Sequence, residues 1–213
     1  MTSRLGAVAS SLDVSRETIL RLEAYETLLG QWQRVKNLVA PSTLTHIWER
    51  HFSDSLQLIA HAPFALRWAD IGSGAGFPGL VIAATLADRP GAVVHLIESD
   101  NRKCAFLREV ARQLGAPAVI HHARAEMAMA GLEPVDVVTA RAVAPLKTLF
   151  ELAKPALDHG AIGLFPKGRG YQAEVAEFIL PKKFQLDIAA SLTDNEAAIV
   201  ILRRNSQASV SDP

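Results

Sequence analysis

Three glycines and one acid in the middle of the chain have the residue types and the spacing of a ligand-binding loop. Asp70 ends a short apolar run, and Gly72, Gly74 and Gly76 follow it at alternate positions. Glycine adopts positive φ without a steric cost and leaves bare backbone for a ligand to lie against. Small apolar residues after Gly79 predict a helix, and backbone N–H groups at a helix start face the ligand in strand–loop–helix units. This stretch therefore predicts a binding site for a small molecule.

The loop alone leaves three interpretations of the ligand open. Gly74, Gly76 and Gly79 match the dinucleotide fingerprint, which is weak by itself. Asp70 lies two residues before Gly72, where a carboxylate would repel a pyrophosphate but attract an ammonium group. This spacing resembles the first motif of the S-adenosylmethionine-dependent methyltransferases, whose cofactor has an amino acid end, a sulfonium and a ribose. A structural turn that binds nothing is the third interpretation.

Polar residues also follow the later apolar runs. An acid such as Glu98, at the end of the run 93–97, can accept both ribose hydroxyls of an adenosine. Ala125 and Glu126 fall where an adenine would lie across the carboxyl edge of a sheet. Arg141 follows the fourth run, and a guanidinium suits phosphate or the O6 and N7 edge of guanine. The competing interpretations are an exposed acid, an ordinary helix start and a surface salt bridge.

The sequence does not contain the residues that several other classes of enzyme or binding site require. No Asn/Asp-Pro-Pro-aromatic segment follows the fourth apolar run, which argues against an exocyclic-amine methylase. The single cysteine, Cys104, falls on a predicted helix, so it does not fit the nucleophile of a cytosine C5 methylase. The histidines show no regular zinc spacing, and we expect no metal site. The glycines at 163 and 168 lack the Lys-Ser/Thr pair of a phosphate-binding P-loop.

Alternating apolar runs and amphipathic segments predict an α/β fold with a parallel sheet and right-handed crossovers. Two neighbouring runs near the end predict an antiparallel pair at the sheet edge. The predicted strands are 66–71, 93–97, 118–120, 135–139, 161–165, 184–191 and 197–202, and the predicted helices are 14–38, one from Ser42, 80–87, 101–114, 145–157 and 170–179. We expect an N-terminal helical extension (1–64), a core (65–204) and a disordered tail (205–213).

The bulk composition is that of a globular chain with a sizeable core. The sequence has 213 residues, 49% of them hydrophobic, and equal numbers of acidic and basic residues. This balance argues against a general nucleic-acid-coating protein but allows a local basic patch. No apolar run is long enough for a membrane helix, and the N-terminus has no signal-peptide core. With one cysteine as well, we expect a cytoplasmic protein that does not act at a membrane.

The motifs taken together resemble the glucose-inhibited division protein B family, the bacterial guanine-N7 methyltransferases of small-subunit ribosomal RNA. The resemblance runs from about Asn37 to Leu202 and is far more specific than the glycine loop. Its motifs are Arg50-His51-Phe52-Ser53-Asp54-Ser55, the loop 70–79, Glu98 with Arg102-Lys103 and Phe106-Leu107, Arg124-Ala125-Glu126, Arg141-Ala142 and Pro166-Lys167-Gly168.

The resemblance implies a class I S-adenosylmethionine-dependent methyltransferase fold, Rossmann-like, with a mixed seven-stranded sheet and an N-terminal helical extension. It implies methyl transfer from S-adenosyl-L-methionine to guanine N7 in 16S ribosomal RNA, at guanine 527. The residues expected to shape the cofactor site are Asp70, Gly72, Gly74, Phe77, Glu98, Ala125, Glu126 and Arg141. Arg141 is also the expected catalytic residue, between cofactor and RNA. The residues expected to face RNA are Lys103, Arg124 and Lys167.

Guanine N7 carries a lone pair and no proton, so this reaction needs no general base and rests on positioning. The expected partner is 16S ribosomal RNA or a small-subunit ribosomal particle, and we expect the enzyme to be a monomer. Two other functions compete with this hypothesis. An NAD-dependent enzyme would use the dinucleotide interpretation of the loop, and a non-catalytic adaptor would use the helix from Val14 to bind a partner.

Overall fold

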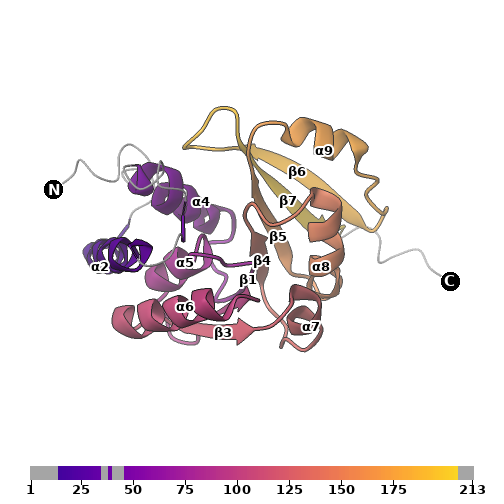
Figure 1. The fold of residues 1–213 in the computed structure, drawn as a ribbon. Coiled ribbons are helices and arrows are strands. Elements are labelled where there is room, and N and C mark those ends of the chain that lie inside the picture. Colours follow the sequence, from indigo (N-terminus) through magenta and orange to yellow (C-terminus); the bar gives the residue numbers. More distant parts are fainter. Residues whose placement is uncertain (1–13, 35–37, 40–45, 206–213) are drawn as a thin grey trace.

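The described part of the protein is organised around one mixed sheet of seven strands (Figure 1). The computed structural model describes residues 14–34, 38–39 and 46–205. The strands are β1 (Arg67–Ile71), β2 (Val93–Glu98), β3 (Ala118–His122), β4 (Val137–Ala140), β5 (Ile162–Lys167), β6 (Phe184–Ala190) and β7 (Ala198–Arg204). Their order is β3-β2-β1-β4-β5-β7-β6. The first five strands are parallel and β7 is antiparallel to both neighbours, which confirms the predicted mixed sheet.

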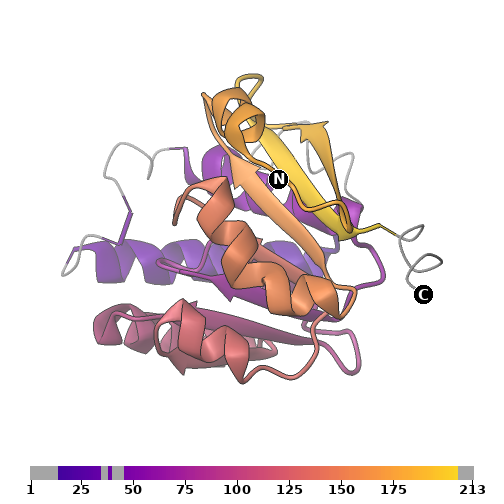
Figure 2. The same ribbon diagram turned by 90° about the vertical axis from the view of Figure 1, so that its right-hand side faces the viewer.

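Helices cover both faces of this sheet. They are α2 (Arg16–Gln33), the π-helical turn η1 (Trp48–Ser53), α4 (Asp54–His61), α5 (Gly79–Thr85), α6 (Asn101–Leu114), α7 (Ala125–Ala130), α8 (Leu146–Asp158) and α9 (Tyr171–Glu177). Figure 1 shows α2, α4, α5 and α6 on one side of the sheet and α7, α8 and α9 on the other. Figure 2 looks onto the second side, with the yellow β7 beside α9.

Helix α6 shows how local chemistry sets an element next to the site. The Asp100 side chain accepts hydrogen bonds from the backbone N–H groups of Arg102 (2.8 Å) and Lys103 (3.0 Å), which have no partner inside the helix. Gly115 ends the helix with φ +58°, a conformation that glycine adopts readily. These two residues explain why the predicted range 101–114 is confirmed without a shift.

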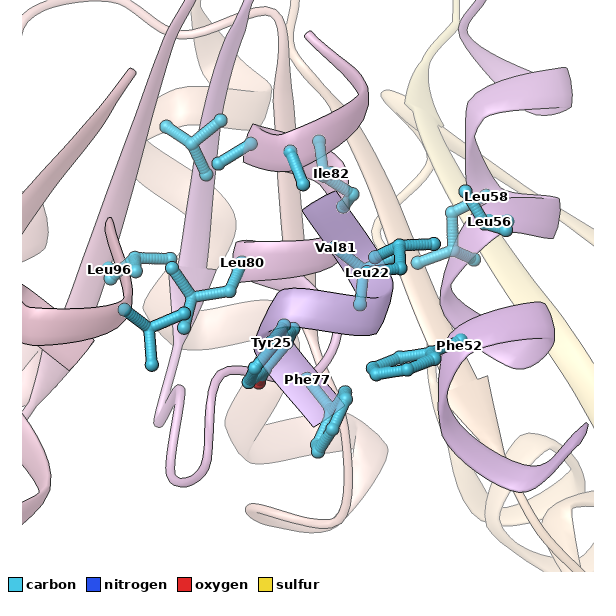
Figure 3. Close-up of a cluster of buried hydrophobic side chains, with 14 of the residues drawn as sticks. Leu22, Tyr25, Phe52, Leu56, Leu58, Phe77, Leu80, Val81, Ile82 and Leu96 are labelled. Atoms are coloured by element: carbon cyan, nitrogen blue, oxygen red, sulfur yellow. The ribbon is translucent and has the colours of Figure 1, made fainter. Parts of the chain in front are cut away.

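The helices before β1 share the hydrophobic core of the sheet. Leu22 and Tyr25 of α2 are fully buried together with Phe52 of η1, and they lie against Phe77 and Leu80 of the glycine-loop region. Figure 3 shows these side chains converging from the three segments. The burial of so much apolar area stabilises the position of the glycine loop as well as that of the helices.

Three local features differ from the sequence prediction. Helix α2 ends at Gln33, whereas the predicted helix runs to residue 38, and the described Leu38 is not helical. Helix α7 was not among the predicted helices, although a helix start was one interpretation of Ala125 and Glu126; it has six residues of which one, Met129, is buried, too few for a visible period. The second N-terminal helix contains the π-helical turn η1, which shifts the spacing of its side chains.

Some predictions fall outside the described residues. The predicted start of the second helix at Ser42 is among them, and so is all of the predicted tail 205–213 except residue 205. The predicted boundary after residue 64 lies in the link between α4 and β1, and the division of the chain there stays a prediction. Among the described helices, none is both long and apolar enough to cross a membrane.

We expect Gly79→Ala to destabilise the protein and Gly30→Ala to stabilise it. A Cβ at Gly79 would lie 2.3 Å from Leu96 Cδ2 and 2.8 Å from Asp70 Cβ, whereas a Cβ at Gly30 has open space around it. Overpacking lowers the free energy of unfolding by about 1–3 kcal/mol, and replacing glycine by alanine at an exposed position inside a helix raises it by about 0.5–1 kcal/mol. Urea denaturation of both variants measures these changes, and equal stabilities would contradict the packing described for Gly79.

Candidate active site

The parallel strands bring the predicted site residues to one edge of the sheet. The carboxyl ends of β3, β2, β1, β4 and β5 lie side by side in that order. The residues at or just after these ends are Asp70 and the glycine loop, Glu98, Arg124-Ala125-Glu126, Arg141 and Lys167. In open parallel sheets, ligands bind at this edge. The predicted residues therefore lie along one edge of the sheet, in the spatial order of the strands that they follow.

Asp70 organises the glycine loop from beneath. Its side chain is fully buried, and Oδ2 accepts a hydrogen bond from the Gly79 backbone N–H at 3.1 Å. Oδ1 is buried without a hydrogen-bond partner. Burial raises the pKa of this carboxyl to about 7. In this arrangement the Asp70 side chain is fully buried beneath the loop, and its predicted contact with a ligand ammonium group stays a prediction. The sequence did not predict this burial, because the position of a residue at a strand end says nothing about its depth.

Glu98 joins the end of β2 to the glycine loop. Its Oε2 accepts from the Gly74 backbone N–H at 2.9 Å, and its Oε1 accepts from the Asp100 backbone N–H at 2.8 Å. Each carboxylate oxygen keeps a further lone pair for another donor. The carboxylate is thus held in one orientation by two backbone groups. That arrangement fits the predicted ribose contact, which stays a prediction.

The loop after β4 lies directly on Gly72. A Cβ at Gly72, which has φ +67°, would lie 2.6 Å from Val143 Cγ2, so only glycine fits below this loop. Ala142 has φ +56°, which is uncommon for a residue with a side chain. The turn at Ala142 therefore places Val143 over the glycine loop.

Phe77 lies between two rings from the N-terminal helices. Its ring stacks on Tyr25 (centroids 5.3 Å apart) and on His51 (4.6 Å), and the Arg141 guanidinium carbon lies 5.4 Å from its centroid. The Tyr25 hydroxyl donates to the carbonyl of Ala75. Phe77 is 5% exposed, so its main role in this structure is to attach the glycine loop to α2 and η1. Its predicted contact with the cofactor stays a prediction.

Arg141 is held by η1 and the start of α4. Its Nη1 donates to the carbonyl of Arg50 (3.0 Å) and to Asp54 Oδ2 (3.3 Å), and its Nη2 donates to His51 Nδ1 (2.6 Å). Because a guanidinium only donates, His51 Nδ1 accepts and the imidazole is neutral. Burial, with the charges of Arg141 and Arg50, lowers the pKa of His51 to about 4. His51 was not predicted as a site residue, although the motif that carries the family resemblance contains it.

Lys167 is more enclosed than the sequence prediction assumed. Its Nζ donates to the carbonyl of Ala144 (2.9 Å) and to Glu174 Oε2 (2.7 Å), and its side chain is 10% exposed. Glu174 Oε2 also accepts from the Leu146 backbone N–H at 2.8 Å. Lys167 is thus paired with a carboxylate and is not an open cation on the surface. Glu174 was missed, because a carboxylate on a polar helix gives no sign of its partner.

The other two predicted cations lie at helix starts on the same edge. Lys103 is half-buried in the first turn of α6, and Arg124 is exposed immediately before α7. Ala125 and Glu126 form the first turn of α7, where Glu126 is exposed. These positions leave Arg124 and Glu126 accessible to a ligand at the edge.

Two hollows adjoin Arg141. The larger, about 900 Å³, lies between η1 and the link from β6 to β7. The smaller, about 470 Å³, is lined by 141–145, 166–168 and Glu174. Arg141 and Lys167 line both, whereas Asp70, Glu98 and the glycine loop line neither. Both hollows therefore adjoin Arg141, and the loop that carries Val143 lies between the smaller hollow and Gly72.

We expect Asp70→Asn to change the stability of the protein in a pH-dependent way. The raised pKa means that the folded state binds the proton of Asp70 more tightly than the unfolded state does. Protonated Asp70 therefore stabilises the folded wild type fully below about pH 4, and this contribution to the free energy of unfolding is lost as the pH rises through about 7. At about 1.4 kcal/mol per pKa unit, the loss is at most about 4 kcal/mol. The stability of Asp70→Asn relative to the wild type should rise between pH 4 and 7 and level off above.

Chemical denaturation across this pH range measures the effect. Asp88→Asn is the control, because a hydrogen bond from Arg21 lowers the pKa of Asp88, so its contribution changes only below this range. A constant difference between Asp70→Asn and the wild type from pH 4 to 8 would contradict the described environment of Asp70.

Comparison with known proteins gives the family. The family model described as rRNA small subunit methyltransferase G matches residues 18–197. The chain is 49% identical over 193 residues to ribosomal RNA small subunit methyltransferase G of Methylorubrum extorquens strain PA1, covering 91% of this chain and 92% of the relative. It is also 49% identical over 207 residues to the protein of that name from Methylobacterium sp. strain 4-46, covering 97% and 95%.

Solved structures give the fold. A mutant of MtNAS in complex with S-adenosylmethionine has a TM-score of 0.58 at 16% identity, over 94% of this chain and 83% of that one. The putative methyltransferase YhhF from Escherichia coli has a TM-score of 0.54 at 18% identity, over 72% and 86%. The predicted class I methyltransferase fold is confirmed by these likenesses together with the strand order. With a family model that spans most of its length and a relative that is 49% identical over 193 residues, this chain belongs to the rRNA small subunit methyltransferase G family.

Proposed function

We propose that this protein transfers a methyl group from S-adenosyl-L-methionine to N7 of a guanine in 16S ribosomal RNA, with guanine 527 as the target implied by the family resemblance. The observation that carries the proposal is the hydrogen bond from the Gly74 backbone N–H to Glu98 Oε2, 2.9 Å long, which joins the glycine loop after β1 to the end of β2. We call the site formed by Gly72, Gly74 and Glu98 the cradle. The names of the relatives support the type of reaction and the type of RNA.

The residues at the cradle fit the cofactor. Gly72 and Gly74 have positive φ and carry no side chain, and the fixed carboxylate of Glu98 has lone pairs for two hydroxyls of a ribose. Ala125 and Glu126, at the start of α7, would border the adenine. When bound, S-adenosylmethionine supplies an electrophilic methyl group on a positively charged sulfur. Asp70 acts on this site indirectly, by fixing Gly79 and so the shape of the loop.

The protein's task in the reaction is to position two reactants. Guanine N7 attacks with an in-plane lone pair, so that lone pair cannot accept a hydrogen bond at the moment of reaction. Arg141 therefore cannot hold N7 in the reactive complex, and its remaining N–H groups would serve O6 or a phosphate. The bonds from Arg141 to Arg50, His51 and Asp54 keep the guanidinium in one place between the cradle and the two hollows. Holding reactants in such a geometry lowers the barrier without proton transfer.

The RNA side of the site is built from few cations. Arg124 and Lys103 lie along the edge, while the formal net charge of the whole chain is +0 at pH 7. A small number of phosphate contacts gives weak binding to free RNA at physiological salt. We therefore propose that the substrate is a small-subunit ribosomal particle, in which ribosomal proteins supply further contacts. We also propose that the enzyme is a monomer and that it acts in the cytoplasm.

Mapping 7-methylguanine in 16S ribosomal RNA from cells with and without this chain tests the proposal. The modification should be absent without the chain, should return with the wild type and should not return with Arg141→Glu. The charge reversal places a carboxylate beside Asp54, which removes the bonds that hold residue 141. Lys182→Glu reverses an exposed charge elsewhere and should restore the modification. Full modification with Arg141→Glu would overturn the role assigned to Arg141.

Glu98→Gln should weaken binding of S-adenosylmethionine about tenfold to a hundredfold. A hydrogen bond to a charged group contributes about 1.5–3 kcal/mol, which corresponds to that range. Isothermal titration calorimetry with S-adenosylmethionine measures the change, and Glu133→Gln, an exposed acid outside the cradle, is the control. Binding of NAD in place of S-adenosylmethionine would favour the dinucleotide interpretation, and binding of neither would favour the adaptor.

A further inference from the structure

The smaller hollow beside Arg141 has the size and the polar groups of a site for a nucleobase. Its volume of about 470 Å³ lies within the range of small-molecule pockets. One wall is the loop 141–145, which contacts the glycine loop through Val143, and the opposite wall is formed by 166–168 and Glu174. The loop after β4 thus borders this hollow on one side and the cradle on the other.

The ion pair on the wall of this hollow has unused hydrogen-bonding capacity. Glu174 Oε2 accepts from Leu146 N–H and from Lys167 Nζ, whereas Oε1 accepts no hydrogen bond from the described residues. Lys167 Nζ uses two of its three N–H groups, on Ala144 and Glu174. Burial raises the pKa of Glu174, but the bonds from Lys167 and Leu146 outweigh it, so the net pKa lies below the usual value. Glu174 is therefore ionised at neutral pH and can only accept.

Methylation at N7 does not by itself distinguish the two purines. Guanine and adenine both have a free lone pair at N7, so an enzyme that selects guanine must read another edge of the base. The Watson–Crick edge of guanine presents the acceptor O6 and the donors N1–H and N2–H₂, whereas adenine presents a donor at N6 and an acceptor at N1. A carboxylate next to a cation matches guanine and opposes adenine. Contacts on this edge also leave N7 free to react.

We propose that Glu174 and Lys167 form the guanine-specificity site of this enzyme, with Glu174 Oε1 accepting from N1–H and N2–H₂ of the target base and Lys167 donating its third N–H to O6. This inference rests on the proposed function. It names a carboxylate that selects the base, whereas Arg141 holds the base or its phosphate near the cofactor. Sites that hydrogen-bond a substrate group reject analogues that lack it, because their own polar groups are left unpaired.

Glu174→Gln is the variant that isolates this role. Its amide oxygen can keep the bonds from Leu146 N–H and Lys167 Nζ, which both require an acceptor. Its amide nitrogen then takes the place of Oε1 and turns an acceptor into a donor. Glu177→Gln makes the same change at an exposed position of the same helix and is the matched control.

The assay compares small-subunit particles reconstituted with 16S RNA that carries guanosine or inosine at the target position. Inosine keeps N7, O6 and N1–H but lacks the 2-amino group. The wild type and Glu177→Gln should have a kcat/KM for guanosine about tenfold to a hundredfold above that for inosine. In Glu174→Gln, methylation of guanosine should fall by about a hundredfold, and the guanosine-to-inosine ratio should fall to within about threefold of one. Its affinity for S-adenosylmethionine, measured by calorimetry, should match that of the wild type.

The outcomes separate this inference from the proposed function. A wild type that methylates neither substrate would overturn the proposed function. A wild type that methylates inosine as well as guanosine would overturn the specificity site without any variant. A Glu174→Gln protein that keeps the wild-type guanosine-to-inosine ratio would also overturn it. Loss of S-adenosylmethionine binding in Glu174→Gln would mean that Glu174 supports the fold of the cofactor site, which contradicts the assigned role.

Discussion

The stack of Tyr25, Phe77 and His51 is the contact on which the geometry of the site depends. It joins the glycine loop to helix α2 and the turn η1, two segments that precede the sheet in the sequence. Aromatic pairs of this kind add to the free energy that their buried area contributes. Since His51 also accepts the hydrogen bond from Arg141, the same stack fixes the arginine that lies between the cradle and the hollows. The N-terminal helices therefore belong to the site as much as the sheet does.

Carboxylates have three different tasks along the sheet edge, and the surroundings of each decide which. Asp70 is fully buried with one unpartnered oxygen, and it shapes the loop. Glu98 is oriented by two backbone N–H groups and faces the cradle. Glu174 is paired with Lys167 and borders the smaller hollow. The same functional group, a carboxylate, thus supports the loop, the proposed cofactor site and the proposed base site, because burial and partners differ.

The elements of the fold were predictable because their periods and caps are local. Asp100 and Gly115 mark the two ends of α6, and the alternation of strands with helices predicted the parallel sheet and its antiparallel end. The position of the site at the carboxyl edge followed from the same alternation. Helix α7 and η1 were missed, since the first is too short to show a period and the second departs from the α-helical spacing.

The partners of the site residues were not predictable in the same way. Arg141 meets His51 across 90 positions of the chain, and no spacing rule connects residues so far apart. The depth of Asp70 and the pairing of Lys167 with Glu174 likewise depend on how finished elements pack. A single sequence shows which residues reach the edge, but it does not show which of them are buried or paired there.

The loop after β4 contacts the glycine loop on one side and borders the smaller hollow on the other. Val143 rests on Gly72, and the same five residues, 141–145, form a wall of the smaller hollow. A ligand that enters the cradle at Gly72 has to move Val143, and this movement changes the shape of the hollow. The resulting change in the free energy of binding a base in the hollow equals the change that the base causes in the free energy of binding at the cradle. Methyl donor and acceptor would then each alter the affinity for the other through one short turn at Ala142, in addition to the direct contact that the transfer itself requires.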